Sequence, residues 1–339
     1  MTTRCNLQCP ICFSRANDVS AAKDPSIEDI LNMIPDYRGR SGAPNISLVG
    51  GESTLREDLP EIIEAIIEKR GLVPRLNTNG LLLLENDLLR KLKKAGLRWI
   101  ILQFDGLDPS ASMAFRGRDL VAVKNEVIIK ASQLGFFFHM AVMVKKGIND
   151  HQVVPILQFA AAHPNIRRVS FYPCSDVGRM GENENGETHV FDVMQAIEKG
   201  TEGQVRIEDI LAGKKMGQNL FRFTQNPMFR ARPCMYSFII FSQKKRLIPC
   251  NRFFSPRWAI REIRAFLKFA WHAAKMLRPS EGDFPADFIF VNIEKFYSDN
   301  GFDLQGARNC HHIYLTDQGA YPFCCYNTLY RNASDSHGK

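Results

Sequence analysis

Short apolar runs alternate with helical patterns from residue 26 to residue 173, and this alternation constrains the fold more than any other feature of the sequence. Strand-like runs at 46–49, 75–80, 99–106, 136–144 and 169–173 are separated by helical patterns at 26–38, 57–69, 88–95, 124–134 and 153–162. Strands that are joined through helices of this length pair in parallel. The sequence therefore predicts a parallel α/β fold over about residues 1–180.

Polar residues and glycines lie at or just after the carboxyl ends of several of these strands, where parallel α/β folds place their functional groups. They are Gly50, Gly51, Glu52, Asn77, Asn79, Gln103 and Asp105. Glycines let the backbone approach a ligand closely, and the Glu52 carboxylate can accept hydrogen bonds from an ammonium group. Asn77 and Asn79 either bind a cofactor or cap the turn. Gln103 and Asp105 point to the same side of their strand, because side chains alternate.

Cys5, Cys9 and Cys12 lie on one short loop with the spacing Cys-x3-Cys-x2-Cys. Three thiolates can bind three irons of a 4Fe–4S cluster, and the fourth iron stays open to a small molecule. A zinc site is the first alternative, but structural zinc normally takes a fourth ligand and uses Cys-x2-Cys pairs. Buried free thiols are the second, and they give no reason for this spacing. The chain has nine cysteines, and their grouping favours metal ligands in a reducing compartment over disulfides.

A second set of cysteines flanks two strand–turn–strand patterns near the C-terminus. Cys234 and Cys250 stand at the base of one predicted hairpin, and Cys310 and Cys324 stand at the base of the other. Two hairpins can bring four thiolates together around an auxiliary iron–sulfur cluster or a single iron. The alternative is a small β domain with buried thiols. Cys325 is expected to point away from Cys324 and is left outside the set.

The alternation stops near residue 180, which predicts a boundary between residues 1–180 and a C-terminal domain at 181–339. Prolines at 256 and 279 delimit one predicted helix, 256–279. At about 100° per residue, its basic residues share one face: Arg257, Arg261, Arg264, Lys268, His272, Lys275 and Arg278. Such a helix lies on an anionic membrane or packs its apolar face on the protein's own core.

The formal net charge of +8 favours an acidic partner, such as phosphate or an anionic membrane surface. No nucleic-acid partner is expected. The sequence has no run of about 18 apolar residues that would span a bilayer, and no signal peptide precedes Cys5. We therefore expect a cytoplasmic protein that contacts the membrane peripherally.

Several motifs, spread over nearly the whole chain, resemble the radical S-adenosylmethionine (SAM) superfamily and, within it, the tetraether lipid synthase-like group, which is also related to radical SAM pterin methyltransferases. These motifs are Cys5–Phe13, Gly50–Arg56, Leu76–Gly80, Gln103–Leu107, Asn300–Leu304, Cys310–Tyr314 and Pro322–Asn327. Ser53 departs from the pattern, because proline is common at that position.

The resemblance implies a partial (β/α) radical SAM barrel with a smaller C-terminal α+β domain that carries the second cysteine set. It implies a 4Fe–4S cluster on Cys5, Cys9 and Cys12, with SAM bound at the open iron and its amino group held by the Gly50-Gly51-Glu52 motif. Reductive cleavage of SAM then gives a 5′-deoxyadenosyl radical, with electrons from a flavodoxin- or ferredoxin-type donor.

The implied reaction modifies an unactivated carbon, and the favoured substrate is a lipid alkyl chain. Methylation of a small heterocycle and modification of a peptide are the rival enzyme functions. An iron–sulfur binding or sensor protein without turnover is the rival from another class. Barrels of this family usually have a strand before the cluster loop, and family members usually carry further cysteines upstream. Only Met1–Arg4 precede Cys5, so a truncated N-terminus is expected.

Overall fold

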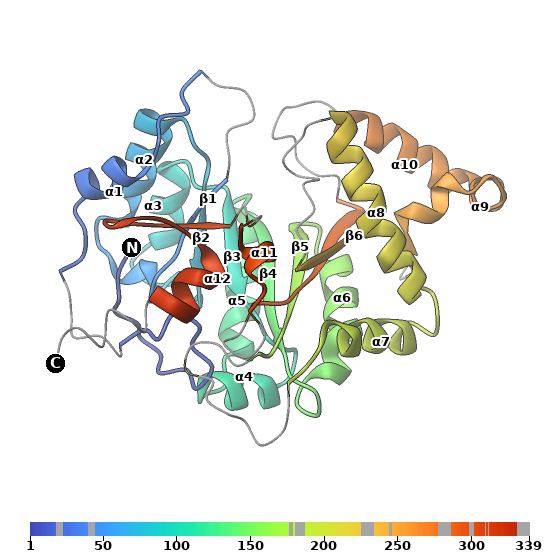
Figure 1. Cartoon of the computed structure of the whole chain (residues 1–339), viewed down its shortest axis with the longest axis horizontal. Coiled ribbons are helices and arrows are strands. Elements are labelled where there is room, and N and C mark those ends of the chain that lie inside the picture. Colours follow the sequence, from blue (N-terminus) through green and yellow to red (C-terminus); the bar gives the residue numbers. More distant parts are fainter. Residues whose placement is uncertain are drawn as a thin grey trace. The chain divides into compact units, whose positions relative to one another are not determined.

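The structure is a computed structural model that describes most of the chain as two compact units (Figure 1). The first comprises Met1–Phe138, Cys174–Glu187 and Phe296–Lys339, and the second comprises His139–Pro173 and Thr188–Lys295. These units interleave along the chain, whereas the boundary expected near residue 180 follows chain order. The described residues are 1–17, 23–39, 45–175, 179, 187–224, 234–243, 246–276, 286–297, 302–308, 310 and 312–330.

The first unit contains three parallel strands that alternate with helices. The strands are β1 (Ile46–Leu48), β2 (Pro74–Thr78) and β3 (Trp99–Gln103), and the helices are α1 (Ile27–Met33), α2 (Leu59–Arg70), α3 (Leu88–Lys94), α4 (Pro109–Arg116) and α5 (Val121–Gln133). Ile46 pairs with Pro74 and Leu76 pairs with Ile100, which sets the register. The strand–helix alternation predicted from the sequence is confirmed, and so is the α/β fold class.

Helix α4 was not predicted, although its ends carry clear signals. Asp108 accepts a hydrogen bond from the backbone N–H of Ser110 at the N-terminus, and Pro109 occupies the first turn. Gly117 ends the helix in the left-handed region, with φ of 75°, where glycine carries no Cβ penalty. The helix delivers its last residue, Arg116, to the candidate site.

The strands of the second unit pair in both parallel and antiparallel directions. Its strands, in sheet order, are β4 (Phe137–Val144), β5 (Ile166–Pro173), β8 (Phe288–Glu294), β6 (Met235–Gln243) and β7 (Arg246–Pro249). Strand β8 runs parallel to β5 and antiparallel to β6. Every residue of β8 is buried, as expected for a central strand. The helices are α6 (Val153–Ala162), α7 (Val190–Gly200) and α8 (Ile207–Thr224).

A chain of buried polar side chains crosses the middle of this second unit. His139 on β4 lies 2.7 Å from the hydroxyl of Ser170 on β5, and Asn292 on β8 donates to the same hydroxyl at 3.0 Å. Ser237 on β6 donates to Asn292 at 2.8 Å. Because buried polar groups must find partners, this chain favours one strand register. His139 is thus a structural histidine.

The segment predicted as one helix, 256–279, instead forms two. Helix α9 covers Pro256–Arg261 and helix α10 covers Ile263–Met276, while residues 277–279 lie outside the described part of the chain. The break falls at Glu262, whose φ of −115° and ψ of 42° are not helical. Its carboxylate accepts a hydrogen bond from Arg246 at 3.0 Å, so an ion pair holds the chain where the helix turns. The helical positions of the single-helix prediction therefore apply only within α10.

The C-terminal segment belongs to the first unit and contains α11 (Leu304–Arg308), β9 (Ile313–Thr316), β10 (Gly319–Pro322), α12 (Phe323–Cys325) and a final turn, Tyr326–Tyr330. Strands β9 and β10 form the second hairpin predicted from the sequence. Phe13 of the cysteine loop stacks on Phe323 with ring centroids 5.0 Å apart. The tail thereby packs against the start of the chain.

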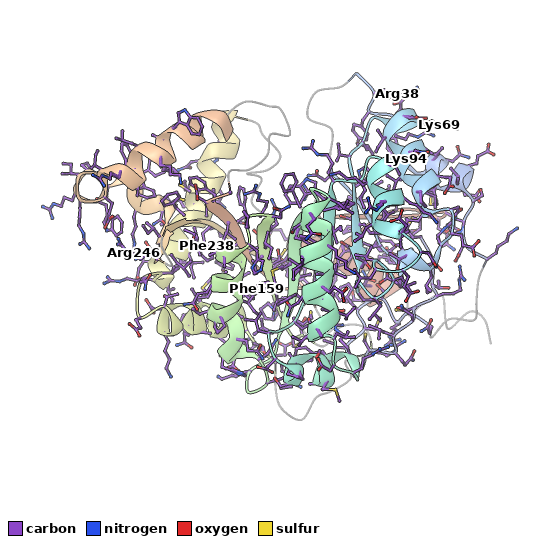
Figure 2. All side chains as sticks on the ribbon, turned by 180° about the vertical axis from the view of Figure 1, so that it is seen from behind. Arg38, Lys69, Lys94, Phe159, Phe238 and Arg246 are labelled. Atoms are coloured by element: carbon purple, nitrogen blue, oxygen red, sulfur yellow. The ribbon has the colours of Figure 1, made fainter. Side chains whose placement is uncertain are left out.

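Many hydrophobic side chains are buried and many basic side chains are exposed, as in other folded proteins. Phe238 on β6 is buried, whereas Arg38, Lys69 and Lys94 lie exposed on the first unit (Figure 2). Among the described helices, none is both long enough and apolar enough to cross a bilayer.

Candidate active site

The loop with the three N-terminal cysteines packs around one small apolar cluster. Leu7, Cys9 and Leu120 are buried together, and Cys5 and Cys12 pack against them. The structure therefore brings the three predicted ligands to one place. Within the described part of the chain, no three His, Cys, Asp or Glu side chains form a group that could hold a single metal ion. Three thiols are the kind of donor set that a 4Fe–4S cube uses, with one thiolate for each iron, and ligation by these three cysteines stays a prediction.

Two residues that the sequence reasoning missed hold the loop in shape. The Asn17 side chain accepts a hydrogen bond from the Cys5 backbone N–H at 2.8 Å and donates to the Cys5 carbonyl at 3.0 Å. Arg179 donates through its side chain to the Cys9 carbonyl at 2.9 Å and through its backbone N–H to the Cys12 carbonyl at 3.0 Å. A left-handed asparagine, with φ of 69°, is a typical turn residue. Arg179 falls shortly after the predicted strand at 169–173, where functional groups are expected, but no local pattern singles it out.

Gly50 and Gly51 lie against the first residues of the chain. A Cβ on Gly50 would stand 2.4 Å from the Thr2 carbonyl oxygen, and one on Gly51 would stand 2.0 Å from that of Arg4. The Gly51 N–H donates to the Thr2 carbonyl at 2.7 Å, and the Glu52 N–H donates to the Arg4 carbonyl at 2.8 Å. The close approach that these glycines permit is therefore one between two segments of this chain. Their contact with a cofactor stays a prediction.

Glu52 is a buried carboxylate that joins two strand ends. Its Oε1 accepts from the Thr54 N–H at 3.2 Å, the Thr54 hydroxyl at 2.7 Å and the Thr78 hydroxyl at 2.8 Å. Its Oε2 accepts from the Asn79 N–H at 2.8 Å. Burial raises the pKa of Glu52, and these hydrogen bonds oppose that shift. A carboxylate oxygen has two lone pairs, so Oε2 can accept one further donor, such as an ammonium group.

Asn79 performs the structural role that the sequence left open, and it also reaches the cysteine loop. Its Oδ1 accepts from the Leu81 N–H at 3.0 Å, and its Nδ2 donates to Asn6 at 2.7 Å. Asn77 differs, because its Oδ1 is buried and has no hydrogen-bond partner among the described residues. A buried acceptor without a partner is unfavourable, so a bound donor would stabilise it. The residues present thus fit a cofactor that carries an ammonium group.

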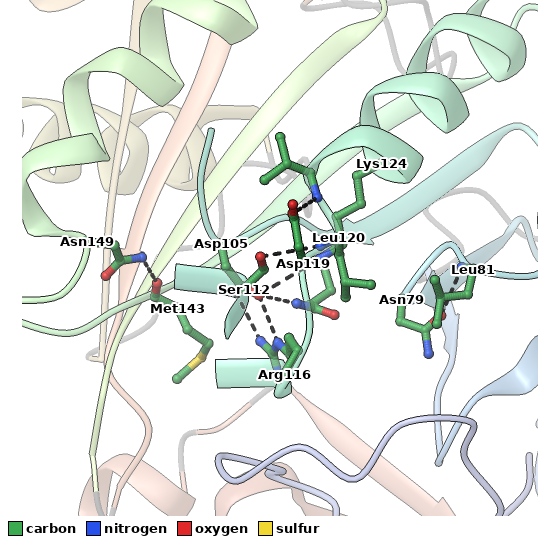
Figure 3. Close-up of polar contacts among 12 residues, drawn as sticks. Asn79, Leu81, Asp105, Ser112, Arg116, Asp119, Leu120, Lys124, Met143 and Asn149 are labelled. Carbon is green, nitrogen blue, oxygen red and sulfur yellow. Dashed lines mark hydrogen bonds and ion pairs between the residues drawn. The ribbon is translucent and has the colours of Figure 1, made fainter. Parts of the chain in front are cut away.

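Asp105 is fully buried at the end of β3 and is held by side chains of this protein. Arg116 donates to its two oxygens at 2.8 and 3.0 Å, Gln103 donates to Oδ2, and the Lys124 amine lies 4.0 Å away (Figure 3). These partners occupy the carboxylate. We therefore assign Asp105 the role of holding Arg116 and leave its predicted cofactor contact as a prediction, together with that of Gln103. The sequence reasoning missed both Arg116 and Lys124.

Burial and nearby charges shift the pKa values of Cys5, Cys9 and Lys124. Burial raises the pKa of Cys5 to about 11 and also raises that of Cys9, while Arg116 opposes the shift at Cys9 through its charge and a hydrogen bond. Burial lowers the pKa of Lys124 to about 8, and Asp105 opposes that shift. A metal ligand must be a thiolate, so the Arg116 contact favours the form of Cys9 that binds iron.

The second cysteine set is divided between the two units. Cys310 and Cys324 belong to the first, and Cys234 and Cys250 belong to the second. Cys250 is fully buried among phenylalanine side chains, which raises its pKa well above the ordinary value. Such surroundings are those of a core thiol, which was the alternative weighed above. The Cys310 thiol donates to the His312 carbonyl at 3.4 Å, and the auxiliary metal site stays a prediction.

Cys325 was set aside on the expectation that it follows Cys324 in a strand. Both residues instead lie in helix α12, and Cys325 interacts electrostatically with Cys310. The strand argument for excluding Cys325 is therefore wrong, because consecutive residues of a helix are about 100° apart rather than on opposite faces.

A cysteine loop packed against the carboxyl ends of parallel strands defines a cluster-binding α/β protein. The pattern of the family described as "Radical SAM superfamily" matches residues 1–160. The chain is 30% identical to the 7,8-dihydro-6-hydroxymethylpterin dimethyltransferase of Methanocaldococcus jannaschii, over 98% of this chain and 76% of that protein. The chain belongs to the radical SAM superfamily. Its cofactors are accordingly a 4Fe–4S cluster and SAM.

Other similarities cover less of the chain. It is 32% identical to the GTP 3′,8-cyclase of Aquifex aeolicus over 47% of this chain and 50% of the cyclase, so it spans about half of that relative. Among solved structures, Streptococcus suis SuiB bound to S-adenosylmethionine matches with a TM-score of 0.46 and 17% identity, over 59% of this chain and 45% of SuiB.

Proposed function

We propose that this radical SAM enzyme modifies an unactivated carbon atom of a lipid alkyl chain. The observation that carries its assignment as a catalyst is the contact between the cysteine loop and the strand ends that bear Glu52 and Asn79. When bound, the cluster and SAM would supply reductive radical chemistry that removes a hydrogen atom from the substrate carbon. A reducing electron donor is needed for this chemistry, and a flavodoxin or ferredoxin is the proposed type.

Each group at the strand ends has a proposed role toward these cofactors. Cys5, Cys9 and Cys12 hold the cluster, and Asn17 fixes the backbone of their loop. Glu52 Oε2 and Asn77 Oδ1 are the acceptors with capacity for the amino group of SAM.

Alanine variants of the loop test the catalytic assignment. Changing Cys5, Cys9 or Cys12 to alanine should abolish the formation of 5′-deoxyadenosine from SAM under reduction by dithionite. The matched control is Cys174→Ala, a buried cysteine outside the loop, which should retain it. Persistent cleavage in the triple variant would contradict the assignment. A wild-type protein that binds the cluster yet never cleaves SAM would be a binding or sensor protein.

The surface of α9 and α10 supports a lipid substrate. Ile260, Ile263, Leu267 and Trp271 are between 49% and 75% exposed, and the last three follow one another at intervals of four residues on α10. Nearby Arg257, Arg261 and Arg264 are exposed as well. An exposed apolar stripe beside basic side chains is typical of helices that lie on anionic bilayers. We propose an anionic membrane surface as the partner of this face.

Flotation with vesicles tests the membrane contact. Wild-type protein should float with phosphatidylglycerol-containing vesicles and less with pure phosphatidylcholine, and added salt should weaken the association because it screens charge. Glutamine at Arg257, Arg261 and Arg264 should reduce flotation. Glutamine at Arg38, Lys69 and Lys94 (Figure 2) removes the same charge elsewhere and serves as the control. An equal loss of flotation in both triple variants would show a general charge effect and would refute the proposed membrane contact of α9 and α10.

Methylation of a small heterocycle is the second candidate, and the names of the relatives favour it. One relative is a pterin dimethyltransferase, and another is a GTP 3′,8-cyclase. Anaerobic reactions with a lipid extract and, separately, with a reduced pterin should be compared by mass spectrometry. Coupled or alkylated lipid supports the first candidate. A methylated pterin with unchanged lipid supports the second and removes the first.

We also propose an auxiliary iron site formed from the second cysteine set. Alanine at Cys234, Cys250, Cys310 and Cys324 should then lower the iron content of reconstituted protein while the spectrum of the first cluster persists. Serine at Cys250 alone separates the alternatives, because a core thiol binds no iron. Unchanged iron content in the quadruple variant would contradict the site.

A further inference from the structure

A buried group of charges lies beside Cys9, and its effect on a cluster bound there goes beyond the roles assigned so far. It consists of Asp105, Arg116 and Lys124, whose side chains are all less than one tenth exposed. Asp105 stands between the two cations (Figure 3). Charges are costly to bury unless they are paired, so a group of this kind has a structural or functional reason.

The charges of this group do not balance. When Lys124 is protonated, two cations face one carboxylate, and the sum is one positive charge. The Lys124 amine has no hydrogen-bond partner among the described residues. Arg116 also donates a hydrogen bond to the Cys9 sulfur, and the negative charge that this sulfur carries as a thiolate acts on Lys124 as well. The excess positive charge therefore lies next to a proposed cluster ligand.

The backbone is shaped to hold this arrangement. Asp105 adopts a left-handed conformation with φ of 63°, which is uncommon for a residue other than glycine. Its two hydrogen bonds to Arg116 form a bidentate pair, which fixes the guanidinium in orientation as well as position. Arg116 is consequently a rigid donor at the end of α4.

We propose that Arg116, held by Asp105 and assisted by Lys124, raises the reduction potential of the cluster bound by Cys9. The inference rests on the proposed ligation by the cysteine loop. Reduction transfers one electron from the donor to the cluster, forms or breaks no bond, and adds one negative charge beside these cations. Hydrogen bonds to cluster sulfurs and nearby net charge both set such potentials. Arg116 and Lys124 thus influence how readily the cluster accepts the electron.

An anaerobic redox titration followed by electron paramagnetic resonance tests the proposal on the reconstituted full chain. Arg116→Gln should lower the ratio of reduced to oxidised cluster at a fixed potential about tenfold, which corresponds to about 59 mV for a one-electron couple. Lys124→Met should act in the same direction by a smaller factor, because its amine makes no direct contact with Cys9.

Arg56→Gln is the matched control. Arg56 is also buried and pairs with an aspartate, Asp58, at 2.6 Å, but it contacts none of the three cysteines of the loop. Its variant should keep the wild-type potential. A potential of Arg116→Gln equal to that of Arg56→Gln would overturn the proposal.

A second variant covers the case in which Arg116→Gln holds no cluster. Arg116→Lys keeps the charge but loses the bidentate pair, so its potential should fall below wild type and above Lys124→Met combined with Arg116→Lys. A wild-type potential in both would overturn the proposal. Failure of the wild-type loop to bind a cluster at all would instead refute the proposed function, so the two failures are distinguishable.

Discussion

Replacing Glu52 by glutamine probes the junction on which the candidate site is built. The two carboxylate oxygens accept backbone N–H groups from opposite sides, from Thr54 at Oε1 and from Asn79 at Oε2. A glutamine amide has one oxygen and one NH2 group, so in either orientation one backbone N–H faces a donor. The threonine hydroxyls can rotate to accept, but the backbone groups cannot. One buried, unsatisfied N–H costs about 1–3 kcal/mol, and the free energy of unfolding should fall by that amount.

Urea unfolding of the apoprotein at neutral pH, followed by circular dichroism, measures this change. Glu64→Gln is the control, because Glu64 is exposed on α2 and its substitution should change the stability by no more than about 0.5 kcal/mol. The opposing effect is desolvation, since burial raises the pKa of Glu52 and the neutral amide avoids that cost. A Glu52→Gln protein as stable as Glu64→Gln would show that desolvation outweighs the hydrogen bonds. It would refute the assignment of Glu52 as the carboxylate that holds the two strand ends together.

Three further substitutions test other parts of the structure. Burial acts to raise the pKa of Asp209, but hydrogen bonds, chiefly from Arg252, hold it below the ordinary value of 3.8. The stabilisation by the Asp209 carboxylate is therefore full above pH 3.8 and is lost as the pH falls below that value. In denaturant titrations, Asp209→Asn should accordingly lose less stability than wild type between about pH 6 and pH 3. Phe269→Ala should cost about 3–5 kcal/mol in the same assay, whereas exposed Leu267→Ala should cost about 0.5 kcal/mol or less. Gly51→Ala should lower the iron bound on reconstitution, because the new methyl group would overlap the Arg4 carbonyl and displace the start of the cysteine loop.

Helices and strands whose apolar residues recur at regular spacing were predictable, because that spacing shows which side of the element is buried. The runs predicted at 46–49 and 75–80 form the parallel neighbours β1 and β2, and α6 spans Val153–Ala162, the same residues as its predicted helix. Helix α4 was missed because it is only eight residues long, although Ala111 and Phe115, four positions apart, are both buried. Its cap signals, Asp108 before Pro109 and Gly117 after Arg116, were present but were not used.

The candidate site divides in the same way between what motifs reveal and what packing decides. Spacing alone placed Cys5, Cys9 and Cys12 together, and the structure packs all three on one apolar cluster. The partners of these residues come from distant positions, and no local pattern announces them. Arg179 is 170 positions from Cys9, and Arg116 lies on a helix that was not predicted, where it donates to Asp105. Sequence reasoning therefore named the candidate ligands and missed the residues that hold them in place.

Helix α10 shows why periodicity could not decide between a membrane face and a core face. The pattern offered one broad apolar side, and the two interpretations competed for the whole of it. In the structure Ala265 and Phe269 are buried over β6 and β8 with other aromatic residues, while Ile263 and Leu267 are about half exposed. At 100° per residue, Ala265 lies about 160° around the helix from Ile263, and Phe269 lies the same angle from Leu267. The helix therefore packs on its own core through one sector and presents a second apolar sector to solvent, so burial of α10 is no argument against a membrane contact.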